Sequence, residues 1–149
     1  MEYWLGLMGE HLPYYENKVT LDKNKKDKWG LAALNIDCEF KENEKKMRID
    51  MRNDAAEILE AAGMKDVQSF DRPAIPGMAI HEMGTARMGR DPKTSVLNKF
   101  NQVHDCRDVF VTDGAAMASS SCVNPSLTYM ALTARAANHA VEELKKRSI

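Results

Sequence analysis

The chain has 149 residues, of which 44% are hydrophobic and 29% are charged, and its formal net charge at pH 7 is −1. This length is sufficient for one domain with an ordinary core, and the composition is typical of a globular protein. The charge balance gives no reason to expect a nucleic acid or an anionic membrane as partner. No apolar run approaches the roughly eighteen residues that a membrane-spanning helix needs.

The first residues, MEYWLGLMGE, contain neither a basic leader nor a small-residue cleavage site, so we expect no signal peptide there. The three cysteines, Cys38, Cys106 and Cys122, are too widely spaced for a disulfide framework or a zinc cluster. We therefore expect three reduced, mostly buried thiols and no metal site.

The N-terminal part predicts a β-hairpin. Residues 15–22 alternate between polar and apolar side chains, and residues 31–40 alternate more clearly, with Leu34, Ile36, Cys38 and Phe40 on one face. The charged run at 22–28, DKNKKDK, is typical of a solvated turn between the two strands. The expected hairpin has one face in water and one face against the protein.

A helical spacing follows from residue 42 to residue 62. It produces a single apolar stripe, and Gly63 is placed to end the helix. The stripe consists of Met47, Met51, Ala55, Ile58, Leu59 and Ala62. Residues 67–70 suggest a further short strand.

Residues 71–108 are rich in proline and glycine and show little periodicity, which indicates irregular loops. The segment 109–111, VFV, is typical of a short buried strand, and the sequence TDG that follows predicts a turn. Asn124 and Pro125 then suit the N-cap and the first position of a helix that continues to about residue 146. Its expected apolar stripe consists of Leu127, Met130, Ala131, Ala134, Ala137, Ala140, Val141 and Leu144.

The stretch 79–89, AIHEMGTARMG, excludes two simple interpretations. A zinc helix of the H-E-x-x-H kind needs a second histidine four residues after His81, but that position is Thr85. A phosphate-binding loop needs lysine and then serine or threonine after its last glycine, but Arg90 and Asp91 follow Gly89. The function of the stretch must therefore depend on residues that come later in the chain.

Three motifs occur in a specific order: H-x-x-G-T-x-x-M-G from His81, VFVTDG at 109–114, and NPSLTYMALTARAA from Asn124. Together they resemble the C-terminal part of the glucose–methanol–choline (GMC) oxidoreductases, which are flavin enzymes that act on alcohols and sugars. The resemblance covers roughly residues 79–146. Within the family, the sequence looks closest to bacterial enzymes that oxidise sugars and glycosides at ring hydroxyls.

The resemblance implies that His81 and Asn124 form the catalytic pair. Oxidation of an alcohol moves a hydride to the flavin and a proton to a base, and an imidazole, with an ordinary pKa of about 6.5, suits that proton. The neutral amide of Asn124 can hold the substrate hydroxyl without competing for the proton.

The resemblance also implies where FAD would be approached. Asp113 and Gly114 correspond to the turn near the ribityl and diphosphate groups, and Asn124, Pro125 and Ser126 correspond to the helix start that faces the isoalloxazine. Free N–H groups at a helix start would stabilise negative charge on that ring. Beside these, Glu82 could orient His81, and Arg87 and Arg90 could contact a phosphate of the cofactor or simply cap the loop.

The G-x-G-x-x-G unit with which this family binds FAD is missing from the chain. We therefore expect about the last quarter of a longer enzyme, which needs an N-terminal Rossmann-type FAD-binding segment as partner and neither holds FAD tightly nor turns over alone. Residues 1–70 would end the substrate-binding domain, and residues 71–149 would be the C-terminal GMC segment. The alternative is a non-catalytic binding or assembly subunit of a multi-chain dehydrogenase.

The expected fold is α+β. It combines a small antiparallel sheet and a packed amphipathic helix with irregular active-site loops and a long C-terminal helix. In the parent enzyme, this piece would complete an α/β FAD domain and a separate substrate domain, and the alanine-rich stripe of its last helix would pack on the FAD domain. The substrate would be an alcohol or a sugar.

Overall fold

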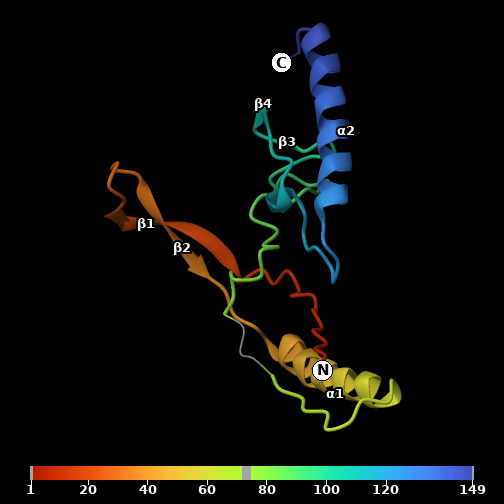
Figure 1. The fold of residues 1–149 in the computed structure, drawn as a ribbon. Helices are drawn as coiled ribbons and strands as arrows, with labels where there is room; N and C mark the ends of the chain where they lie inside the picture. The colour runs from red at the N-terminus through yellow and green to blue at the C-terminus, as the bar shows by residue number, and fades with distance from the viewer. Residues whose placement is uncertain (1, 72–74, 149) are drawn as a thin grey trace.

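The computed structural model describes residues 2–71 and 75–148 and has the α+β organisation that the sequence predicts. Two short antiparallel sheets and two long helices make up the regular structure (Figure 1). The elements are β1 (Lys18–Lys26), β2 (Ala32–Asp37), α1 (Glu42–Ala61), β3 (Gln102–Val103), β4 (Cys106–Phe110), a 3-10 turn η1 (Gly114–Ala116) and α2 (Ser126–Lys145).

The first sheet is the predicted hairpin, but its turn lies later in the chain than expected. β1 extends through most of the charged run to Lys26, so the turn predicted at residues 22–28 is wrong. The Asp27 carboxylate makes the actual turn by accepting hydrogen bonds from the backbone N–H groups of Trp29 and Leu31. Polar residues at this hairpin tip carry no apolar alternation, which is why the sequence pattern misses the end of β1.

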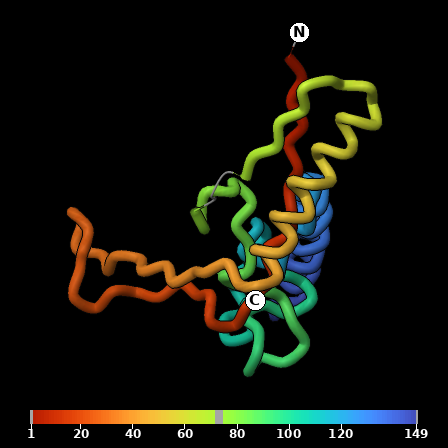
Figure 2. Tube along the Cα trace, turned by 90° about the horizontal axis from the view of Figure 1, so that it is seen from below, coloured from red at the N-terminus to blue at the C-terminus, as the bar shows by residue number. Residues whose placement is uncertain are grey.

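The apolar side chains of the hairpin lie together on one face, and that face is exposed. Val19 is opposite Ile36 and Leu21 is opposite Leu34, so the four side chains point the same way. The exposed fraction is 64% for Leu21 and 67% for Leu34. Figures 1 and 2 show the hairpin extending away from both helices. The face that was expected to pack against the protein is therefore exposed to solvent.

α1 has nearly the predicted bounds and packs on the N-terminal segment. Glycine at position 9 permits this approach, because a Cβ there would come within 2.6 Å of Met47 Cε. The predicted strand at 67–70 is wrong, since that stretch leaves α1 without pairing to a strand. An ion pair of 2.7 Å between Arg48 and Asp71 instead holds its end near the helix.

The most deeply buried hydrophobic side chains described are Leu97, Ala116 and Ala136, each exposed by 2% or less. They come from the loop before β3, from η1 and from α2, which Figure 1 shows beside one another. The strand predicted at 109–111 lies partly within β4, which begins earlier, at Cys106, and ends at Phe110. Its partner, β3, has only two residues and too short a pattern to be predicted.

α2 packs on the rest of this chain through a face other than its predicted apolar stripe. Its inner face carries Tyr129, Leu132, Ala136 and His139, and the His139 ring stacks on Phe100 with the ring centroids 3.8 Å apart. The predicted apolar stripe is mostly exposed instead, with Leu127 at 78%, Met130 at 68%, Val141 at 50% and Leu144 at 64%. Apolar residues therefore lie on two faces of α2, and only one is covered.

Asn101 ties α2 to the second sheet and is fully buried. Its backbone is left-handed, with φ at 63°, a conformation that asparagine tolerates better than most residues. Its side-chain amide donates to the carbonyl of Val111 at 3.0 Å, and its side-chain oxygen accepts from Arg135 of α2 at 3.1 Å. One polar side chain thus joins Val111, the residue after β4, to the helix.

The three cysteines are free thiols, but the expectation that they are mostly buried is wrong, because Cys106 and Cys122 are exposed and Cys38 is half-buried. Over residues 2–71 and 75–148, neither helix has the length and apolar character required to cross a membrane.

Candidate active site

The structure brings His81 and Asn124 into direct contact. Nε2 of His81 lies 2.9 Å from Oδ1 of Asn124, although the two residues are 43 positions apart. His81 is half-buried and Asn124 is exposed, so the pair is open to solvent on one side. With the amide in this orientation, the imidazole donates its Nε2 proton to the amide oxygen.

This contact corrects the prediction for the start of α2. The N-cap residue is Pro125, and no side chain caps the helix start in the described structure, so Asn124 is not the N-cap. The Asn124 side chain, which could have capped the helix, contacts His81 instead. The first N–H groups of α2 are therefore left without the side-chain acceptor that helix starts usually have.

The loop that carries His81 is fixed by backbone hydrogen bonds to η1. The N–H groups of Gly84, Ala86 and Met88 donate to the carbonyls of residues 114, 115 and 116 at 3.4, 2.9 and 2.9 Å. Gly84 has φ at 90°, which strongly favours glycine. The first two motifs of the sequence therefore pack together as one unit, immediately after His81.

The turn that was predicted to approach the ribityl and diphosphate groups of FAD has a clear structural role here. The Asp113 carboxylate accepts a hydrogen bond of 3.0 Å from the N–H of Ala115 and so caps η1. Gly114 is buried, and a Cβ there would lie 2.9 Å from both Met83 Sδ and Tyr129 OH. A larger residue at position 114 would therefore have to displace side chains where the His81 loop, η1 and α2 meet.

Two other predicted candidates support the loop backbone. The Glu82 carboxylate accepts a hydrogen bond of 2.8 Å from the N–H of Ala79, so it braces the approach to His81. The carbonyl of Arg87 accepts from the N–H groups of residues 96 and 97. Arg90 lines an open depression of about 400 Å³ together with Lys99 and His104.

Sequence reasoning missed two features of the site. Tyr129 donates a hydrogen bond of 3.4 Å to Met83 Sδ, which links α2 to the His81 loop; its place in the third motif was the available signal. Ser119 donates to the Glu10 carboxylate, across 109 positions of sequence. No local pattern could have revealed that second contact.

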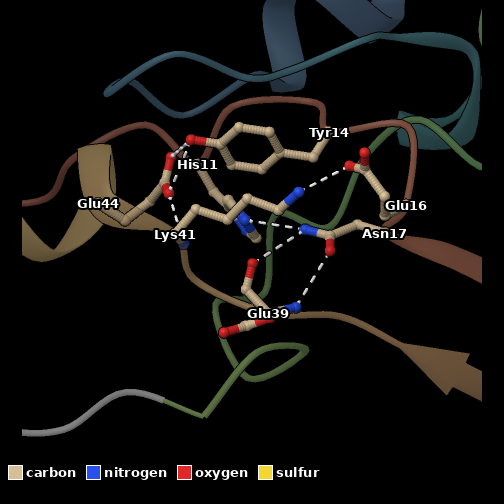
Figure 3. Close-up of polar contacts among 7 residues, drawn as sticks. All are labelled: His11, Tyr14, Glu16, Asn17, Glu39, Lys41 and Glu44. Atoms are coloured by element: carbon tan, nitrogen blue, oxygen red, sulfur yellow. Dashed lines mark hydrogen bonds and ion pairs between the residues drawn. The ribbon is translucent and has the colours of Figure 1, made fainter.

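A separate polar cluster surrounds the start of α1 (Figure 3). Glu44 is only 2% exposed, and its carboxylate accepts from the N–H groups of Leu12 and Lys41 at 3.2 and 2.9 Å and from the hydroxyl of Tyr14. Burial raises the pKa of Glu44, but the backbone hydrogen bonds outweigh it and lower the pKa from 4.5 to about 2. Lys41 also pairs with Glu16 at 2.7 Å.

Comparison with known proteins supports the family resemblance that the three sequence motifs indicate. The family profile described as GMC oxidoreductase matches residues 13–133. The chain belongs to the GMC oxidoreductase family. The family assignment made from the sequence is therefore confirmed, and GMC oxidoreductases are generally FAD-dependent.

Relatives of this GMC oxidoreductase chain are named for the oxidation of alcohols and sugars. The 2-methyl-1,2-propanediol dehydrogenase of Mycolicibacterium austroafricanum is 39% identical over 89% of this chain and 24% of its own length. The fructose dehydrogenase large subunit of Gluconobacter japonicus is 32% identical over 92% of this chain and 25% of its own length. The C-glycoside 3-oxidase of Arthrobacter globiformis is 29% identical over 87% of this chain and 25% of its own length. The chain thus spans about a quarter of these relatives and corresponds to their C-terminal part.

Proposed function

We propose that this chain supplies the catalytic pair and the flavin-facing helix start of an FAD-dependent oxidoreductase that acts on CH–OH groups of alcohols or sugars. The observation that carries the proposal is the 2.9 Å contact between His81 and Asn124, two residues that the family resemblance pairs. The substrate class follows the names of the relatives, which include a diol dehydrogenase and a fructose dehydrogenase subunit.

In this proposal, His81 takes the hydroxyl proton of the substrate. His81 Nε2 and Asn124 Oδ1 are only 2.9 Å apart. A substrate hydroxyl oxygen placed beside both side chains can therefore lie within hydrogen-bond distance of each of them. After a half-turn of the Asn124 amide, its NH₂ group would donate to the hydroxyl oxygen of the substrate. With the ring proton on Nδ1, the single lone pair of Nε2 would then remain free to accept the hydroxyl proton.

The residues around the pair suit a flavin. When bound, FAD would accept the hydride that leaves the substrate carbon. The uncapped start of α2 presents free N–H groups and the positive end of the helix dipole, which stabilise negative charge nearby. Pro125 is buried whereas Asn124 and Ser126 are exposed, so the polar side chains at this helix start are accessible to a ligand.

We further propose that the chain acts as part of a larger assembly. Residues 1–70 would belong to the substrate-binding domain and residues 71–149 to the C-terminal segment, with an N-terminal FAD-binding segment as partner. The exposed apolar stripe of α2 and the exposed face of the hairpin are surfaces that such a partner would cover. The chain alone would then be inactive and would not retain FAD.

The test is FAD titration followed by turnover. The chain would be titrated alone and with the FAD-binding segment supplied separately, using flavin fluorescence and calorimetry. We expect stoichiometric FAD binding and sugar or alcohol oxidation only in the mixture. In that mixture His81→Ala should lower the rate of flavin reduction by roughly 100- to 10,000-fold, the usual range for loss of a general base.

His104→Ala is the matched control, because His104 bonds Ser95 at 3.0 Å, away from the pair, and this variant should keep the rate. A His81→Ala rate within about threefold of the unmodified protein would contradict the assigned role. Tight FAD binding by the chain alone would contradict the need for the partner segment. FAD binding in the mixture without any turnover would favour a non-catalytic subunit.

A further inference from the structure

A contact between distant segments involves the loop that leads to Asn124 but is not part of the catalytic pair. The hydroxyl of Ser119 donates a hydrogen bond to Oε1 of Glu10, and both residues are half-buried. Ser119 is in the loop that leads from η1 to Asn124, and Glu10 is in the N-terminal segment beside α1. A hydrogen bond to an ionised carboxylate is roughly twice as strong as one between neutral groups.

Glu10 is well placed to act as an anchor, because the backbone on both sides of it is fixed to α1. On one side, Gly9 packs so closely on Met47 that a Cβ there would displace the methionine side chain. On the other side, the N–H of Leu12 donates to the buried Glu44 carboxylate at 3.2 Å, and Tyr14 bonds the same group (Figure 3). The carboxylate of Glu10 therefore projects from a segment that is held to the helix before and after it.

The loop that receives this contact needs an anchor. Residues 117–125 have no helix or strand, and Ser121 within them is left-handed, with φ at 59°. At the start of the loop, the carbonyl of Ala118 lies 3.5 Å from the position that a Cβ on Gly84 would take. At its end, Asn124 contacts His81. Ser119 lies between these ends and contacts Glu10 of the N-terminal segment.

We infer that Glu10 is a positioning residue for Asn124. Through Ser119 it holds the loop from residue 118 to residue 124 in the form that sets the Asn124 amide against His81. The importance of this for catalysis rests on the proposed function, but the positioning itself is a property of the chain. It makes the geometry of the pair depend on how the N-terminal segment sits on α1.

The test uses the 149-residue chain and reads the pair directly by NMR. Nitrogen-15 signals of the imidazoles, assigned with the help of His81→Ala, report which ring nitrogen of His81 carries the proton. The Asn124 side-chain amide signals report whether that amide is held. We expect Glu10→Ala and Ser119→Ala each to abolish the His81–Asn124 contact signals, and the double variant to do no more than either single one.

Glu10→Gln and Ser119→Thr are the matched rescue variants, because each keeps the oxygen that the hydrogen bond needs. Both should retain the signals of the pair, although the neutral amide introduced by Glu10→Gln accepts a weaker bond than the carboxylate. Glu16→Gln is the control for losing a carboxylate elsewhere, since Glu16 pairs with Lys41 at 2.7 Å and does not contact the loop. It should leave the His81 and Asn124 signals unchanged.

Unchanged pair signals in Glu10→Ala, with the chain still folded by circular dichroism, would overturn the inference. Loss of the pair in Glu16→Gln as well would also overturn it, because the effect would then be general. If Glu10→Ala unfolds the chain, Ser119→Ala decides, because it removes the same hydrogen bond from the other side: an intact pair in this folded variant overturns the inference.

The same variants separate this inference from the proposed function. In the FAD-loaded mixture, Glu10→Ala should lower kcat by on the order of 10- to 100-fold with little change in KM, the scale expected when a reacting group is misplaced by about an ångström. If His81→Ala proves fully active while the NMR result holds, the proposed function fails and the positioning role stands. If His81→Ala is inactive and Glu10→Ala leaves the pair intact, only the positioning role fails.

Discussion

The two long helices begin in opposite ways. At the start of α1, the N-cap residue Lys41 makes no side-chain cap, but the buried Glu44 carboxylate reaches back to accept from the N–H groups of Lys41 and Leu12. The helix start is therefore held to the N-terminal segment by the chain itself. At the start of α2, no side chain provides such an acceptor among the described residues, and Asn124, which could have capped the helix, bonds His81. A capped start stabilises a fold, whereas an uncapped start beside a histidine leaves its N–H groups available to a ligand.

The largest expected effect concerns the capped start. Glu44→Ala should lower the free energy of unfolding by about 3 kcal/mol, because the N–H groups of Leu12 and Lys41 lose a charged acceptor in a buried place. Thermal unfolding should show a melting temperature lower by about 10 °C. Glu42→Ala is the control: Glu42 is in the same helical turn, is 74% exposed, and pairs only loosely with Lys46 at 3.6 Å. Equal losses in the two variants would show that the Glu44 bonds are not responsible.

The second effect concerns the uncapped start. Asn124→Ala should leave the unfolding of the chain within about 0.5 kcal/mol of the original, since this exposed residue does not cap α2. In the FAD-loaded mixture, however, we expect the rate of flavin reduction to fall about 100-fold, equivalent to about 2.7 kcal/mol of transition-state stabilisation. Stopped-flow reduction and thermal unfolding together measure both parts. A large stability loss without a rate loss would mean that the two helix starts serve the same purpose.

The smallest expected effect is a loss of stability at acidic pH that is caused by Glu44 of α1. The folded-state pKa of Glu44 is about 2, below its ordinary value of 4.5, so its contribution to stability is present above about pH 4.5 and is lost as pH falls toward 2. Between pH 6 and pH 3 this amounts to about 2 kcal/mol. Urea unfolding of the original chain and of Glu44→Gln at both pH values isolates the contribution. The difference in free energy of unfolding between the two proteins should be smaller by that amount at pH 3 than at pH 6. An equal difference at both pH values would contradict the low pKa assigned to Glu44.

The sequence predicted the elements whose residues carry a repeating apolar pattern. Both helices and the hairpin were found, with the end of α1 placed one residue late. The run after Leu21 was misjudged because charged strand residues look like a turn when neither face is buried. The segment 67–70 was misjudged because a short apolar run does not specify a strand without a partner.

Site residues could be predicted where they belong to a recognisable motif. Their contacts could not be predicted where those contacts depend on the tertiary structure. His81 and Asn124 were chosen from their motifs, and the structure places them 2.9 Å apart. The cap role given to Asn124 was wrong because local propensity cannot account for a histidine that arrives from 43 positions away. The apolar stripe of α2 was expected to pack on a separate FAD domain, and it is exposed in this chain. The face through which α2 packs here was not predicted, because periodicity identifies an apolar face but not what covers it.

Asn101 sets a limit on how this sequence can vary. Glycine would accept the left-handed backbone but would leave the carbonyl of Val111 and the guanidinium of Arg135 without their buried partner. Aspartate would keep the acceptor for Arg135 and lose the N–H donor for Val111, and a β-branched side chain could not adopt the backbone at all without strain. Since no other residue meets all three demands, we expect random mutagenesis of this codon followed by selection for folded protein to return asparagine almost alone.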